Sequence, residues 1–277
     1  MIADVRTQEV NLGGVRVVYQ ESGTGRPLVC VHGNFASKRW FTEQLKAPPE
    51  GWRVLALDLP NFGESDALEG GISIGAYADV LRGFVETLDF SAFALMGHSL
   101  GGGVAQVYAA RFPDTLSALI LIAAAGPSGL VTPEERYVGL EMLKDNPGLM
   151  ASALEPTMPT GKPSYFDGIV EDALNMNPDA FSGNARALER YNVTSALKKV
   201  MCPVLVVRGE QDYLVSEEVA RETAAAFAGV SGGARLELWE HIGHSPQIED
   251  FERFNHLLND FLKGAEWRRI EEDYGLR

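Results

Sequence analysis

Seven short runs of Val, Leu, Ile and Ala alternate along the chain with stretches in which apolar residues recur every three or four positions. The runs begin at positions 15, 27, 53, 93, 118, 203 and 235. Helical periodicity lies within residues 74–89, 99–112, 216–227 and about 247–262. Short apolar runs between amphipathic helices are typical of buried parallel strands. The pattern therefore predicts an α/β fold, a mostly parallel sheet flanked by helices.

The alternation stops between Gly126 and Val200. This stretch contains seven prolines, short helical pieces and no convincing strand. Its larger apolar residues include Met142, Met150, Met158, Phe166, Met176 and Phe181. We interpret residues 127–200 as an inserted helical lid (cap) over the strand ends where α/β proteins bind ligands. Most of its methionines and phenylalanines are expected to bury its own underside, and residues 1–126 and 201–277 are expected to form the core.

The composition is that of a soluble globular protein, with 45% hydrophobic and 22% charged residues. A formal net charge of −14 repels phosphate backbones and anionic lipid, so neither nucleic acid nor a membrane is an expected partner. Asp4 and Arg6 interrupt the start of the chain before the apolar segment of a secretory signal can form, and no apolar run is long enough to span a bilayer. These features predict a cytoplasmic protein.

Two further features carry weaker expectations. Cys30 and Cys202 lie in or beside apolar runs and are expected to be small buried thiols. Near the C-terminus, Trp267, Ile270 and Tyr274 follow helical spacing among charged residues. A docked helical extension explains them, and a dimer contact is the alternative, so the sequence allows a monomer or a homodimer.

The string GHSLGG, residues 97–102, stands where an apolar run becomes a helical pattern. A serine hydroxyl is a weak nucleophile, and a sharp strand-to-helix turn is one way to present it to a base. Such a turn requires small residues two positions before and after the serine, here Gly97 and Gly101, because the two backbones pass close together. It also places Ser99 at a helix N-terminus, where N–H groups stabilise developing negative charge. The position of the string favours a nucleophile over an incidental serine.

A catalytic serine needs a base. Of the five histidines, His244 is the expected base because Gly243 lets its loop turn inward, and His241 is the second candidate. His98, beside Ser99 but pointing away from it, is expected to be a packing residue, and His256 an ordinary helix side chain.

The base needs an orienting acid. Asp212 follows the apolar run that begins at position 203, at the same edge of the predicted sheet as Ser99. Glu210 is its nearby competitor. The interpretation as a surface loop charge fits Glu210 better, so Asp212 is the expected acid.

The order Ser, Asp, His, together with HGN at 32–34, DLPNFGESD at 58–66 and GHSPQIE at 243–249, resembles the α/β-hydrolase superfamily. The resemblance implies an oxyanion hole formed by the backbone N–H groups of Asn34 and Leu100, with the Asn34 side-chain amide as a further donor. His32 is expected to have a structural role, and the resemblance implies that Asp58 shapes the fold and takes no part in the chemistry. No metal or organic cofactor is required.

Within this superfamily, Ser99 argues against the dehalogenases and epoxide hydrolases, which carry an aspartate at that position. The main hypothesis is a serine carboxylesterase that cleaves small to medium neutral esters through an acyl-enzyme. Residues 32–66 also resemble acyl-homoserine lactone hydrolases, so the small-molecule substrate is an ester or a lactone. Carbon–carbon bond hydrolases are similar in length and lid, but usually place tryptophan where Ser245 stands. A non-catalytic ligand-binding protein of the same fold is the remaining alternative.

Overall fold

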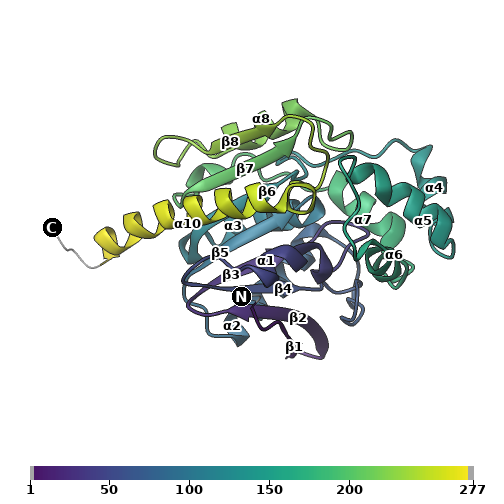
Figure 1. Cartoon of the computed structure of the whole chain (residues 1–277), viewed down its shortest axis with the longest axis horizontal. Coiled ribbons are helices and arrows are strands. Elements are labelled where there is room, and N and C mark those ends of the chain that lie inside the picture. Colours follow the sequence, from purple (N-terminus) through teal and green to yellow (C-terminus); the bar gives the residue numbers. More distant parts are fainter. Residues whose placement is uncertain (1–2, 274–277) are drawn as a thin grey trace.

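A computed structural model describes the backbone of residues 3–273 and the side chains of residues 3–265. The side chains of Trp267 and Ile270, and the whole of Tyr274, therefore lie outside the described residues. Its strands form one sheet in the order β1-β2-β4-β3-β5-β6-β7-β8 (Figure 1). They are β1 (Arg6–Leu12), β2 (Val15–Gly23), β3 (Arg26–Val31), β4 (Trp52–Leu57), β5 (Phe93–His98), β6 (Leu116–Ile122), β7 (Val204–Gly209) and β8 (Arg235–Trp239). Strands β3 to β8 pair in parallel, as predicted.

The first strand, β1, was not predicted. It pairs antiparallel with β2 over seven residues, and β2 pairs antiparallel with β4. Most of β1 is exposed, so it has too few apolar positions to leave a buried-strand pattern. Gly13 and Gly14, both at positive φ, form the two-residue turn that joins β1 to β2.

Helices cover both faces of the sheet. The alternation along β3 explains the two layers: Val29 packs in the core cluster shared with α2 (Ile74–Thr87), α3 (Leu100–Arg111) and α8 (Glu217–Ala226). Leu28 packs on the opposite face, with α1 (Thr42–Lys46) and α10 (Phe251–Asp273). The short α1 was not predicted. The helix expected at about 247–262 is divided into α9 (Pro246–Glu249) and α10.

Residues 127–200, called the insert below, connect β6 to β7. They contain α4 (Arg136–Met142), α5 (Pro147–Leu154), α6 (Phe166–Leu174) and α7 (Ala180–Glu189), which lie together beyond one end of the strands (Figure 1). The expected apolar series is buried against the core cluster, with one exception. Met142 is 61% exposed, so it is the one member of the series that does not follow the burial expected for most of them.

The two ends of the insert are joined to each other at a narrow neck. The backbone N–H of Val193 donates to the carbonyl oxygen of Pro127 at 2.8 Å. The hydroxyl of Tyr191 donates to the carbonyl oxygen of Gly126 at 2.6 Å. The chain therefore enters and leaves the insert at one place. Within the described residues, none of the helices combines the length and apolar character needed to cross a membrane.

Candidate active site

Ser99 lies on the turn between β5 and α3, with φ 53° and ψ −115°, a backbone conformation that residues other than glycine rarely adopt. A Cβ atom on Gly97 would lie 2.3 Å from the carbonyl oxygen of Gly101, and one on Gly101 would lie 2.2 Å from that of Val31. Both positions therefore require glycine. At Gly97 the reason is the predicted one, the close approach of β5 and α3, whereas at Gly101 it is the close approach of α3 to the end of β3. The backbone N–H of Ser99 donates to Ile122 on β6 at 3.0 Å, which fixes the turn against the sheet.

Leu100 is the first residue of α3, a helix of 12 residues. The N–H groups of a first helical turn have no acceptor within the helix, and the helix dipole adds partial positive charge there. The sequence-predicted donor at Leu100 thus follows Ser99 at a point where negative charge is stabilised.

Asp212, on the loop after β7, and His244, on the loop after β8, form a buried hydrogen bond of 2.8 Å between Oδ2 and Nδ1. The second carboxylate oxygen of Asp212 accepts from the backbone N–H groups of Leu214 and Val215 at 2.9 and 3.0 Å. Burial raises the pKa of Asp212, but His244 and these hydrogen bonds outweigh burial, so the pKa is lowered overall. An ionised Asp212 only accepts hydrogen bonds, so Nδ1 of His244 carries the proton and Nε2 is left as the basic nitrogen.

The competing pair on the same two loops lies at the surface. Glu210 and His241 are both exposed, and the backbone N–H of His241 donates to Glu210 at 3.3 Å. Their side chains do not form the buried carboxylate–imidazole contact that Asp212 and His244 make. The geometry therefore favours Asp212 and His244 for the acid and base.

His98 does more than pack. Its ring stacks on Trp40 with centroids 5.1 Å apart, and its Nε2–H donates to the carbonyl oxygen of His244 at 2.9 Å. Because a carbonyl oxygen only accepts, this contact assigns the proton to Nε2. Burial lowers the pKa of His98 to about 3, with a further contribution from His244. The prediction of a packing role missed this contact, which holds the main chain of the expected base.

His32 has the structural role expected for it. The backbone N–H of Leu59 donates to its Nε2 at 3.1 Å, and its Nδ1–H donates to the carbonyl oxygen of Gly33 at 2.8 Å. A Cβ atom on Gly33 would lie 3.0 Å from the Cβ of Ser99, so this loop passes directly beside the expected nucleophile. Asn34 follows at once, which brings its backbone N–H close to the Ser99 turn.

Ser99, His244 and Asn34 line one cavity of about 250 Å³ between the core and the insert. Most of its wall is apolar, and the insert supplies a large share, including Leu140, Met150, Leu154 and Leu188. Arg136 is the one lysine, arginine, aspartate or glutamate among the described lining residues, and its side chain is exposed. The cavity can therefore hold an apolar group beside Ser99.

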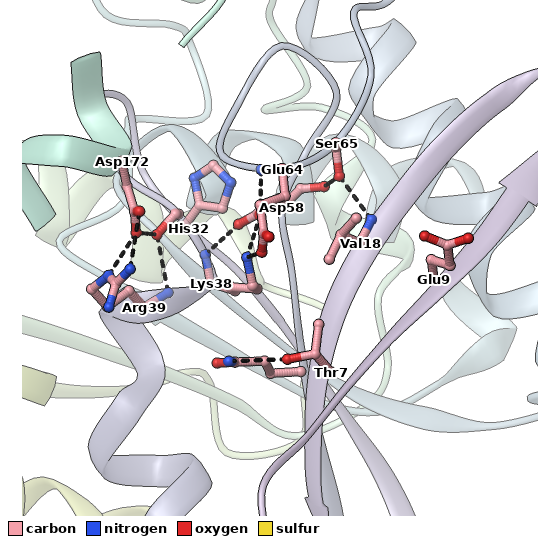
Figure 2. Close-up of polar contacts among 12 residues, drawn as sticks. Thr7, Glu9, Val18, His32, Lys38, Arg39, Asp58, Glu64, Ser65 and Asp172 are labelled. Atoms are coloured by element: carbon pink, nitrogen blue, oxygen red, sulfur yellow. Dashed lines mark hydrogen bonds and ion pairs between the residues drawn. The ribbon is translucent and has the colours of Figure 1, made fainter. Parts of the chain in front are cut away.

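Ion pairs made by Lys38, with Asp58 and Glu64, and by Arg39, with Asp172, hold the segment after Asn34 in place (Figure 2). The buried carboxylate of Asp58 accepts from the Lys38 side chain and from its backbone N–H, both at 2.7 Å, which fits the fold-shaping role expected of Asp58. Arg39 donates two hydrogen bonds to Asp172 on α6, at 2.7 and 3.1 Å. The pair of Arg39 and Asp172 connects the core directly to the insert.

One contact to the expected oxyanion loop carried no signal in the sequence. Asn184, on α7 of the insert, is fully buried, and its Nδ2–H donates to Oδ1 of Asn34 at 2.8 Å. The two asparagines are 150 positions apart. No local spacing marks such a pair, so it emerges only from the fold.

Residues 26–177 match the family described as alpha/beta hydrolase fold. The chain belongs to this family. It is 28% identical over 280 residues to a 2-hydroxy-6-oxononadienedioate/2-hydroxy-6-oxononatrienedioate hydrolase of Burkholderia vietnamiensis, covering 90% of this chain and 91% of the relative. It is 26% identical over 274 residues to the non-heme chloroperoxidase CPO-A1 of Kitasatospora aureofaciens, covering 90% and 96%.

Among solved structures, the esterase EaEST of Exiguobacterium antarcticum is similar with a TM-score of 0.80, at 24% identity over 90% of this chain and 96% of that chain. This likeness concerns the fold. Together with family membership it confirms the predicted α/β-hydrolase architecture, and the relatives support a hydrolase.

Proposed function

We propose that the protein is a serine hydrolase that cleaves small to medium neutral carboxylic esters through an acyl-enzyme on Ser99. The observation that carries the proposal is the buried hydrogen bond between Asp212 and His244 at the wall of the cavity that Ser99 also lines. Nucleophile, base and acid come from the loops after β5, β8 and β7, an arrangement that supports triad chemistry.

In the proposed reaction, Ser99 Oγ attacks the acyl carbonyl carbon while Nε2 of His244 takes the hydroxyl proton. The tetrahedral intermediate then collapses, and His244 gives the proton to the leaving alcohol. A water molecule, deprotonated by His244, attacks the resulting acyl-enzyme and releases the acid and free Ser99. Throughout, Asp212 orients His244 and stabilises its protonated form.

The oxyanion of each tetrahedral intermediate would be held by the backbone N–H groups of Asn34 and Leu100. Each fixed donor contributes roughly 3 to 4 kcal/mol of transition-state stabilisation in comparable sites. The close approach of Gly33 to Ser99 supports this role, because it places the two loops side by side.

The substrate preference rests on the wall of the cavity. We assign the insert, residues 127–200, as the lid that supplies the acyl pocket, and its apolar residues favour uncharged chains. Each methylene buried there favours binding by about 0.8 kcal/mol until the pocket is full. Activity should therefore rise and then fall with acyl length. Arg136 is exposed and can remain hydrated, so it does not change this expectation for the interior.

The test combines labelling with a series of substrates. The purified protein should hydrolyse nitrophenyl esters with an optimum chain length and react with a serine-specific fluorophosphonate. Ser99→Ala should lose both activities by several orders of magnitude while its melting temperature stays nearly unchanged. Full activity in Ser99→Ala, or no turnover and no labelling in the wild type, would reject the proposal.

A lactone substrate is the second candidate, favoured by the likeness of residues 32–66 to acyl-homoserine lactone hydrolases. A lactone is a cyclic ester, so the same nucleophile, base and oxyanion donors apply. Running lactones of matched acyl length beside the esters separates the two. Highest activity on anionic dienoates would instead favour carbon–carbon bond cleavage. The buried Ser245 after His244 argues against that activity, because carbon–carbon bond hydrolases usually carry tryptophan at this position.

A further inference from the structure

A chain of hydrogen bonds crosses from the loop after β4, through α2 and the insert, to Asn34. The backbone N–H of Leu68 donates to Oδ1 of Asn61 at 3.0 Å, and Nδ2–H of Asn61 donates to the Tyr77 hydroxyl at 3.1 Å. The Tyr77 O–H donates to Oδ1 of Asn184 at 2.8 Å, and Nδ2–H of Asn184 donates to Oδ1 of Asn34 at 2.8 Å. Asn61, Tyr77 and Asn184 are buried. We call these three residues the relay.

The direction of the relay is fixed at its first link. A backbone N–H only donates, so the side chain of Asn61 must present its oxygen to Leu68 and its nitrogen to Tyr77. The Tyr77 hydroxyl then has its hydrogen left for Asn184. Burial raises the pKa of Tyr77, so this hydroxyl keeps its proton. Asn184 must in turn present its nitrogen to Asn34.

Asn34 has an unused donor group, the NH2 of its side-chain amide. Its Oδ1 is occupied by Asn184, while its Nδ2 makes no hydrogen bond to another of the residues that the structure describes. Asn34 is only partly buried, and it lines the cavity with Ser99. The relay therefore ends in an unused amide group at the cavity wall beside the expected nucleophile, where an acceptor on a ligand can bind it.

We infer that Asn61, Tyr77 and Asn184 are positioning residues that hold the Asn34 carboxamide with its Nδ2–H toward the cavity, where it donates to an oxygen of the substrate. The inference rests on the proposed function of Ser99. It makes the insert part of the reaction site, because Asn184 belongs to α7. A second contact joins the insert to the same relay: the backbone N–H of Asn177 donates to the carbonyl oxygen of Asn61 at 2.8 Å.

The decisive experiment is a double-mutant cycle on the nitrophenyl ester with the highest turnover. Asn34→Ala removes the donor itself and should lower kcat about 100- to 1,000-fold. Asn184→Leu leaves Asn34 in place but frees its carboxamide to rotate, and should lower kcat about 10-fold with KM within threefold of wild type. In the Asn34→Ala background, Asn184→Leu should have no further effect on kcat, because the group that it positions is already absent.

Two controls separate orientation from loss of stability. Asn255→Leu makes the same change at a partly buried, hydrogen-bonded asparagine on α10, away from the cavity, and should leave kcat unchanged. If Asn184→Leu does not fold, Tyr77→Phe removes one link with little change in shape and should lower kcat about threefold, again only when Asn34 is present.

Three results would overturn the relay as a positioning device: near-wild-type kcat in folded Asn184→Leu, multiplied effects in the double variant, or an equal loss in Asn255→Leu. Each of them leaves the proposed function intact, because the wild type would still turn over the ester. Failure of the wild type to turn over esters or to react with fluorophosphonate counts against the proposed function instead.

Discussion

The edge of the sheet and the insert both face the cavity, but they hold their polar groups by different means. At the sheet edge, backbone contacts do the holding: Gly97 and Gly101 admit no side chain, and Ser99 has a strained φ. In the insert, side chains reach across to the core, as Asp172 does to Arg39 and Asn184 to Asn34. Backbone contacts leave almost no freedom of position, whereas side-chain contacts can be exchanged one residue at a time.

This difference indicates a division of labour. The sheet edge holds the proposed reacting groups, so substitutions there should abolish turnover or folding. The insert lines the cavity and carries the proposed relay to one donor, so substitutions there should change rates and preferences by smaller factors. Four sets of variants can break or sharpen that division, from the largest expected effect to the smallest.

On the sheet edge, Asp212→Asn should lower kcat by about four orders of magnitude, because an amide no longer fixes the useful tautomer of His244. The same change in the triad of a serine protease has an effect of this size. Glu210→Gln, two residues away on the same loop, should leave kcat unchanged. Steady-state kinetics on a nitrophenyl ester decides between them, and a crippled Glu210→Gln beside an active Asp212→Asn would reverse the assignment of the acid.

A pair of glycines tests the backbone side of the comparison. Gly101→Ala should reduce the free energy of unfolding by more than about 3 kcal/mol, because its Cβ would meet the Val31 carbonyl oxygen at 2.2 Å. Gly139→Ala, on α4 of the insert with nothing within 4 Å of its Cβ, should be neutral or stabilise by up to about 1 kcal/mol. Chemical denaturation measures both. Equal losses in the two variants would show that the insert is packed as tightly as the turn.

The buried His98 at the sheet edge should make the free energy of unfolding depend on pH. The pKa of His98 is about 3 in the folded chain against an ordinary 6.5, so between these values the unfolded chain binds a proton that the folded chain does not. Its contribution is complete above pH 6.5 and is lost as the pH falls toward 3, by at most ~1.4 kcal/mol per pH unit.

The variant His98→Gln keeps a donor for the His244 carbonyl oxygen but does not titrate. Its free energy of unfolding should therefore fall less steeply than that of the wild type between about pH 6.5 and 4. Denaturant titrations across this range give the two slopes, and only their difference matters, because the lost stacking on Trp40 shifts the whole curve. Parallel curves would mean that His98 takes up its proton in the folded state.

The stabilisation from the ion pair between the insert and the core should depend on salt concentration. Asp172→Asn weakens the bidentate pair with Arg39, which is 40% exposed, so the loss should be about 1 kcal/mol or less. High salt should reduce the difference between variant and wild type, because it screens exposed charges. Thermal melts at low and high salt measure the effect. If Asp172→Asn instead lost several kcal/mol of stability at both salt concentrations, this contact would be as important to the fold as the backbone contacts of the sheet edge.

Much of the core could be read from the sequence because its signals are local. Buried strands leave continuous apolar runs, and the requirement for Gly97 follows from the turn around Ser99. Gly101 was predicted from the same turn, but its Cβ would meet the end of β3, about 70 positions earlier in the chain. The strand β1 was missed although its signal was present: Gly13 and Gly14 form a two-residue hairpin turn. Its few apolar residues gave it no run of its own, and pairing with β2 through the backbone leaves no trace in side-chain pattern.

The insert could be predicted only in outline. Its helices have 7 to 10 residues, about two to three turns each, so their periodicity is too short to fix their bounds. The contact from Asn184 to Asn34 depends on how α7 lies over the core, which no spacing encodes. His98 was placed correctly beside Ser99, but its hydrogen bond to His244 joins residues 146 positions apart.

The neck has a consequence for how such a protein can change over evolutionary time. Val193 is hydrogen-bonded to Pro127, and Tyr191 to Gly126. The insert is therefore one long loop whose two ends are held together. Lengthening a loop between fixed ends costs little, roughly 0.6 kcal/mol for each doubling. Replacing the whole segment would therefore change the wall of the cavity while leaving the proposed nucleophile, base and acid in place on the core.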